Sequence, residues 1–193
     1  MARYAACSRR DFLKLSAAGG GLLLGLHLPL TTRGQNSSAA DQFAPNAWIR
    51  IDSDGAIVFM VARSEMGQGV MTSLPMLLAE ELEGGLDQIT VRFAPADPAY
   101  TNKLIGQQLT GGSTSIRDAW TKLREAGAVA RTLLVQAAAA RWGVEADDCR
   151  AERGEGIHPD GKPRLGYGAL ATEAAALPLP PGVFLKEPDA WRL

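Results

Sequence analysis

The chain has 193 residues, of which 46% are hydrophobic and 21% charged, a composition typical of one globular domain. Five basic residues and one acid lie before position 39, so the remainder carries 15 basic and 20 acidic residues. This acidic balance argues against nucleic acid as a partner, because phosphate binding needs a basic face. The two cysteines, Cys7 and Cys149, are too few for an iron–sulfur cluster, which usually takes about four thiolates.

The N-terminal segment has the pattern of an export signal. Paired arginines, Arg9 and Arg10, precede an uncharged, glycine-rich run over 15–30. That run of about 16 residues is short for a membrane-spanning helix, which needs roughly 20. The pattern is typical of proteins exported folded by the twin-arginine (Tat) translocase. We predict a Tat signal and linker over residues 1–38 and a periplasmic location, with an uncleaved membrane anchor or an ordinary amphipathic start as alternatives.

The rest of the chain alternates between strand-like and helix-like segments. Runs rich in β-branched and aromatic residues predict strands, and apolar residues three or four positions apart predict helices. The predicted elements, in chain order, are a hairpin (48–51 and 56–61), a helix (72–82), a strand (88–93), a long helix (116–142), a short hairpin made of the run 150–157 and a turn at 158–161, and a last helix (167–176). This order predicts an α+β fold, in which a small mixed sheet packs against helices.

The two longer helices allow more detailed predictions. Pro75 falls in the first turn of the helix predicted over 72–82, where its missing N–H has no cost. On the long helix, apolar residues recur near one face, which we expect to lie in the core. These residues are Ile116, Trp120, Leu123, Leu133 and Leu134.

A segment of about 18 residues, 94–111, has no predicted structure and lies between two glycine loops, 64–69 and 112–115. Each loop runs into a helix start, whose free N–H groups and positive dipole end suit phosphate or another anion. Bare glycines also let the backbone approach a ligand closely. The alternative is simple glycine punctuation, with Ser113 as the N-cap of the long helix.

Both loops resemble the molybdenum hydroxylases, the xanthine dehydrogenase/aldehyde oxidase family. The first match is EMGQGV (65–70) with LPMLLAEEL (74–82), and the second is TGGSTS (110–115) with IRDAW (116–120). The similarity is strongest to large (beta) subunits of the isoquinoline 1-oxidoreductase type. It continues through 123–130, 142–144, 167–168 and 185–193, and so covers nearly the whole chain.

The resemblance implies a site for a molybdopterin dinucleotide, in its cytosine form. The first loop would line the pterin–phosphate part of the cofactor, and the second would lie close to the molybdenum ligands and the dithiolene. Carried over residue by residue, the implied cofactor-binding residues are Gly67, Gln68, Gly69, Gly112, Ser113 and Ser115. A glutamine amide both donates and accepts hydrogen bonds, which suits an amide-rich pterin.

The chain departs from the family pattern in lacking a counterpart of the glutamate that serves as general base in the complete subunit. Glu65, Glu80 and Glu81 are glutamates by type only, and we expect them to be loop and helix-surface charges. No catalytic or metal-ligating residue is therefore assigned. We expect residues 39–185 to be the N-terminal part of a molybdopterin-binding domain, and residues 186–193 to begin the following domain.

The resemblance implies that the complete protein oxidises aldehydes or N-heteroaromatics with water as the oxygen source. Its implied partners are the remaining part of the large subunit and a small subunit carrying [2Fe–2S] clusters, with a cytochrome c as a candidate electron acceptor. The alternative is a non-catalytic exported remnant, or an assembly module that needs a second polypeptide. A neighbouring reading frame that continues the family pattern would favour a split enzyme.

Overall fold

The computed structural model describes residues 22–25 and 47–192, so Arg9, Arg10 and most of the predicted signal and linker lie outside the described residues. The first sheet has the order β1 (Leu22–Gly25), β2 (Ala47–Ile51), β3 (Ile57–Val61) and β4 (Ile89–Phe93). β1 and β2 pair antiparallel, as do β2 and β3, whereas β3 and β4 are parallel. This confirms the predicted mixed sheet. β1 belongs to the run predicted as part of the export signal.

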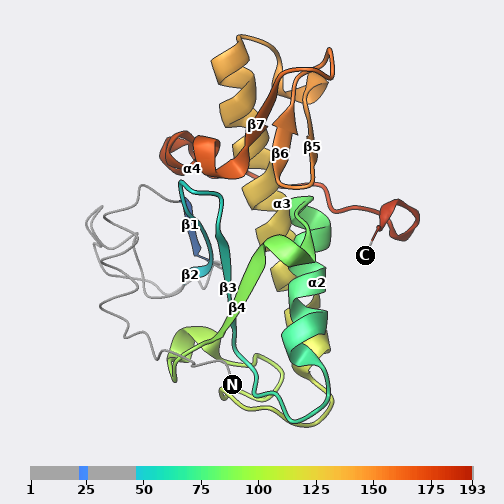
Figure 1. Ribbon diagram of the computed structural model, residues 1–193. Helices are drawn as coiled ribbons and strands as arrows, with labels where there is room; N and C mark the ends of the chain where they lie inside the picture. The colour runs from blue at the N-terminus through green and yellow to red at the C-terminus, as the bar shows by residue number, and fades with distance from the viewer. Residues whose placement is uncertain (1–21, 26–46, 193) are drawn as a thin grey trace.

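β3 and β4 are parallel because a helix returns the chain between them (Figure 1). This helix, α2 (Val70–Leu82), packs along the long α3 (Ser115–Trp142), and both cover the sheet. The two helices approach most closely at Gly127, where an added Cβ would lie 2.5 Å from the carbonyl oxygen of Leu78. The core between helices and sheet contains Ile51, Ile57, Phe59, Leu78, Leu82, Leu123, Leu133 and Leu134.

A second sheet lies at the far end of α3. It has the order β5 (Arg150–Glu152), β6 (Glu155–Ile157) and β7 (Arg164–Gly166), and α4 (Tyr167–Ala176) follows it. α4 was predicted, and so was a hairpin made of the run 150–157 and a turn at 158–161. The structure divides that run into the paired strands β5 and β6, and the predicted turn leads from β6 to β7. The Tyr167 hydroxyl donates to the Leu82 carbonyl oxygen at 2.6 Å and so joins α4 to the end of α2.

Two predictions about the helices are wrong. α2 begins at Val70, two residues earlier than predicted, so Pro75 is its sixth residue and lies inside the helix. Trp120 is 37% exposed and does not belong to the core, whereas Leu123 is buried. Because successive residues turn about 100° around a helix, Trp120 lies at the margin of the stripe that Ala119 and Leu123 direct inward. It contacts the ring of Trp191 instead.

The segment 94–111, predicted to lack structure, is organised around buried side chains. It contains a 3-10 helix at Pro98–Tyr100 and a β-bridge between Asn102 and Gln107, and both Tyr100 and Asn102 are buried. In the described part of the chain, no helix combines the length and the apolar character that crossing a membrane requires.

Candidate functional site

The two glycine loops meet at one end of the α2–α3 pair. The first glycine loop (64–69) joins β3 to α2. The second leads into α3 and is taken from here on as the whole matched segment 110–115, which contains 112–115 (Figure 1). The backbone N–H of Ser64 donates to the Thr110 hydroxyl oxygen at 2.8 Å, which connects the two loops directly. All six residues that the resemblance implies for the cofactor therefore lie on two adjoining loops.

The glycines of these loops have conformations that require glycine, and they face open space. Gly67, Gly69 and Gly112 have φ angles of +92°, +82° and +60°. A Cβ added at Gly67 or Gly69 would meet no atom within 4 Å, and one at Gly112 would meet only the Thr114 methyl group at 3.7 Å. The chain's own packing does not occupy this space, so the backbone of both loops remains accessible to a ligand.

The first glycine loop supplies its own anion. The Glu65 carboxylate accepts hydrogen bonds from the backbone N–H groups of Gly67 at 2.8 Å, Gly69 at 3.0 Å and Met71 at 3.1 Å. These bonds, led by that from Met71, lower the pKa of Glu65. The sequence predicted N–H groups free for an external anion at the start of α2, and this is wrong for Gly69 and Met71. The carboxylate also explains why α2 begins early, because it caps the first turn.

Gln68 braces the same loop. Its Nε2 donates to the Ser64 carbonyl oxygen at 2.8 Å, and its Oε1 accepts from the backbone N–H of Met66 at 2.6 Å. An amide has two N–H donors and an oxygen with two lone pairs, so these bonds use half of its capacity. Gln68 is exposed, and its outward donor and acceptor positions remain available for the predicted contact with the cofactor.

Buried side-chain hydrogen bonds support the second glycine loop, but no side chain caps the helix that follows it. The Thr114 hydroxyl donates to the Gly111 carbonyl oxygen at 2.8 Å and accepts from Asn102 Nδ2 at 2.6 Å. Thr114 is the N-cap of α3, yet its side chain makes no capping hydrogen bond. Ser113, the N-cap in the alternative interpretation of this loop, adopts the left-handed conformation with φ +52°. The first turn of α3 thus presents its N–H groups without a side-chain cap.

Sequence reasoning missed Asn102, which is fully buried and supports the second glycine loop. Its Oδ1 also accepts from the backbone N–H of Leu104 at 3.0 Å. The available signal was a single asparagine between Thr101 and Lys103 in a stretch without periodicity, and nothing in that pattern marks it as buried.

The three glutamates weighed as bases are all engaged in structural contacts. Glu80 and Glu81 were predicted to lie on the helix surface, and this is wrong, because Glu81 is 0% exposed and Glu80 9%. Arg124 approaches Glu81 at 2.7 Å and Arg131 at 3.7 Å. Lys186 contacts Glu80 through its ammonium group and Glu81 through its backbone N–H, at 3.1 Å.

The C-terminal segment therefore packs on α2 and α3. The backbone N–H of Arg192 donates to Glu80 Oε2 at 3.0 Å, and the Phe184 carbonyl oxygen accepts from Arg131 at 3.1 Å. Sequence periodicity could not place these acids inside, because the residues that contact them lie between 43 and 112 positions later in the chain. Within the described residues, no group of three or more His, Cys, Asp or Glu side chains is arranged to hold a metal ion.

Comparison with known proteins identifies the family. A sequence profile described as the molybdopterin cofactor-binding domain matches residues 8–190. The chain belongs to this family. The beta subunit of isoquinoline 1-oxidoreductase from Brevundimonas diminuta is 40% identical over 129 residues, which are 66% of this chain and 16% of that protein. The membrane-bound aldehyde dehydrogenase [pyrroloquinoline-quinone] of Gluconacetobacter polyoxogenes is 29% identical over 193 residues, 92% of this chain and 24% of that protein.

Solved structures show the same fold. Quinoline 2-oxidoreductase from Pseudomonas putida 86 superposes with a TM-score of 0.50 at 16% identity, over 73% of this chain and 18% of that one. The Cu,Mo-CO dehydrogenase superposes with a TM-score of 0.50 at 22% identity, over 70% of this chain and 17% of that one. The chain thus spans less than a quarter of the length of these curated relatives and structures.

Proposed function

We propose that the two glycine loops form one wall of a molybdopterin dinucleotide site, in the cytosine form of the cofactor. The observation that carries this proposal is the junction of the loops at the Ser64–Thr110 hydrogen bond, with open space over Gly67, Gly69 and Gly112. Molybdopterin is bulky and anionic, and a wall of exposed backbone without Cβ atoms suits such a group.

The two loops would do different work in this site. In the second loop, Gly112, Ser113 and Ser115 lie at the uncapped start of α3, where free N–H groups and the helix dipole favour negative charge. In the first loop, Gly67 and Gly69 would give close approach to the pterin–phosphate part, while Gln68 holds the loop in shape and offers its remaining amide positions. The residues present fit the cofactor on these grounds.

We further propose that the complete protein is the large subunit of a periplasmic molybdenum hydroxylase that oxidises aldehydes or N-heteroaromatics with water as the oxygen source. When bound, the molybdopterin group supplies the oxygen-transfer and two-electron redox chemistry. A small [2Fe–2S] subunit, and a cytochrome c beyond it, would take the electrons. The names of the curated relatives support this class, since they include an isoquinoline oxidoreductase and an aldehyde dehydrogenase.

The alternative is an assembly module that needs a second polypeptide, and one observation is common to both proposals. Glu65, Glu80 and Glu81 are each committed to hydrogen bonds or ion pairs of the fold. None of the three is therefore placed to act as the general base. The two proposals differ in whether the remaining residues are joined to this chain or supplied by a neighbouring gene product, and the downstream reading frame distinguishes them.

The loop assignment is tested by a matched pair of glycine variants. Gly67 and Gly55 have φ angles of +92° and +88°, and a Cβ at either would meet no atom within 4 Å. Gly67→Ala and Gly55→Ala should therefore cost the fold the same, about 1–2 kcal/mol of left-handed strain. In the assembled enzyme we expect Gly67→Ala to lose molybdenum and releasable cytosine nucleotide, and Gly55→Ala to keep both. Equal cofactor contents would remove the first loop from the site.

The export proposal rests on Arg9 and Arg10. Replacing both with Lys should retain the protein in the cytoplasm, and continued appearance of the double variant in the periplasm would refute it.

A further inference from the structure

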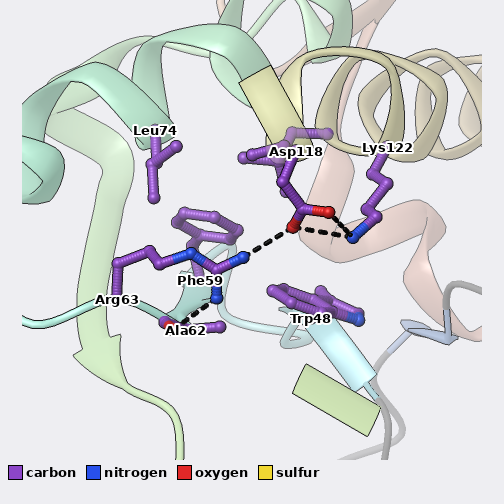
Figure 2. Close-up of a pocket in the computed structure, with 9 residues that line it drawn as sticks. Trp48, Phe59, Ala62, Arg63, Leu74, Asp118 and Lys122 are labelled. Atoms are coloured by element: carbon purple, nitrogen blue, oxygen red, sulfur yellow. Dashed lines mark hydrogen bonds and ion pairs between the residues drawn. The ribbon is translucent and has the colours of Figure 1, made fainter. Parts of the chain in front are cut away.

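The two glycine loops are joined a second time, below their exposed surface, by a buried ion cluster. Arg63 directly precedes the first loop and is 4% exposed, and Asp118 lies in the first turn of α3 and is 9% exposed. Arg63 Nη2 lies 2.5 Å from Asp118 Oδ2, and Lys122 Nζ lies 2.8 Å from both oxygens of the same carboxylate (Figure 2). This cluster, Arg63–Asp118–Lys122, thus bridges the start of the first loop and the end of the second.

The same cluster holds the segment between the loops. Asp118 Oδ1 accepts from the backbone N–H of Lys103 at 2.9 Å. Arg63 Nη1 donates to the Ala62 carbonyl oxygen at 2.7 Å and to that of Tyr100 at 3.4 Å. One carboxylate and one guanidinium therefore connect three chain segments that are far apart in sequence.

The surroundings of the cluster are partly apolar. Trp48, Phe59 and Leu74 line the small pocket beside Arg63 and Asp118 (Figure 2). Burial among these groups lowers the pKa of Arg63, and the Asp118 charge opposes that shift. Removing one partner of such an ion pair is destabilising, because it leaves a buried charge uncompensated. Two cations and one anion also leave the cluster with a net positive charge behind the uncapped start of α3.

From this geometry we propose that Arg63 and Asp118 are positioning residues, which set the spacing of the two glycine loops and thereby shape the cofactor site. Both side chains are buried beneath the loops, and they act through the backbone that they anchor. Only the last part of this inference, that the loop spacing shapes the cofactor site, rests on the proposed function. The coupling of the two loops is a property of this chain and can be measured without cofactor.

The test is amide hydrogen exchange on the full chain, with a buried acid elsewhere as the matched control. Asp118→Asn removes a buried carboxylate between two cations at the loop end, and Glu81→Gln removes one between Arg124 and Arg131 near the other end of α2. Both variants should be destabilised. After correction for the change in global stability, we expect Asp118→Asn to raise the exchange rate about tenfold or more in the peptides covering both 64–71 and 103–115. We expect Glu81→Gln to leave the exchange rate of both peptides unchanged.

Two outcomes would overturn the coupling: faster exchange in only one loop, or the same change in both variants. If Asp118→Asn does not fold, Arg63→Lys replaces it. Lysine keeps the charge but loses the guanidinium fork, which reaches the Asp118 carboxylate through Nη2 and the Ala62 and Tyr100 carbonyl oxygens through Nη1. This variant should produce the same pattern at smaller amplitude.

Cofactor content of the assembled enzyme separates this inference from the proposed function. We expect Asp118→Asn to lower molybdenum and cytosine nucleotide while Glu81→Gln retains them. If Asp118→Asn keeps its full cofactor content and Gly67→Ala loses it, the positioning role is refuted and the proposed cofactor site is still supported. Full content in Gly67→Ala as well would refute the site itself.

Discussion

The two glycine loops look alike in sequence but differ in how their helix starts are satisfied. At the start of α2, three backbone N–H groups donate to the Glu65 carboxylate, an anion that the loop itself contains. At the start of α3, Thr114 turns its hydroxyl toward Gly111 and Asn102, and no side chain caps the helix. Three N–H groups of the first loop and the start of α2 thus already have an anionic partner, whereas the N–H groups at the start of α3 have no side-chain cap.

This difference teaches that a glycine loop before a helix is not by itself an anion site. What decides is whether a nearby carboxylate already accepts the N–H groups, and that depends on the path of the loop. We therefore expect the negatively charged part of a ligand to lie closer to the second loop, and the first loop to contribute shape and amide contacts.

The largest expected effect comes from removing the support of the second loop. Asn102→Ala should lower the free energy of unfolding by about 1–3 kcal/mol, because it leaves buried polar partners of a fully buried amide unsatisfied. Gln108→Ala is the control, since Gln108 braces Pro95 and Asp97 in the same segment without touching Thr114. Urea unfolding and hydrogen exchange would measure both. If Gln108→Ala loosens the second loop as much as Asn102→Ala does, the special role of Asn102 is wrong.

A smaller effect is expected at Glu65, and it should depend on pH. Its folded-state pKa is lowered, so the stabilisation is complete above the ordinary glutamate value of about 4.3 and is lost as pH falls through the folded value. Glu65→Gln should abolish that acid dependence and speed amide exchange over 67–71. Glu173→Gln is the control, because Arg141 lowers the pKa of this carboxylate by a hydrogen bond far from the loops. Unchanged exchange over 67–71 in Glu65→Gln would contradict the capping role.

The smallest effect is expected at Ser113, and its sign is informative. Ser113→Gly relieves a left-handed residue, which should stabilise the fold by about 0.5 kcal/mol after the greater entropy of glycine in the unfolded chain is subtracted. Arg153→Gly, at φ +47°, is the control and should gain a similar amount. Thermal melts measure both. If Ser113 serves the cofactor, only Ser113→Gly should also lower cofactor content, and a destabilised Ser113→Gly would show that the serine supports the loop.

Much of the fold follows from local pattern. The hairpin of β2 and β3 was predicted because β-prone runs flank an Asp/Gly turn, and α4 was predicted at its observed ends. The family was also recognised from the two loops and then shown by the profile match over residues 8–190. Errors arose where a residue's surroundings come from distant segments, as for Trp120, which lies against Trp191, and for Glu80 and Glu81, which the C-terminal segment covers.

The sequence by itself determined that two glycine loops precede two helices, because glycine punctuation and helical periodicity are local and legible along the chain. Only the tertiary structure decided which helix start is already neutralised, since that depends on where the Glu65 carboxylate and the Thr114 hydroxyl turn. Only the tertiary structure shows that Arg63 pairs with Asp118, 55 positions away. A buried ion pair between distant segments produces no periodic pattern in the sequence.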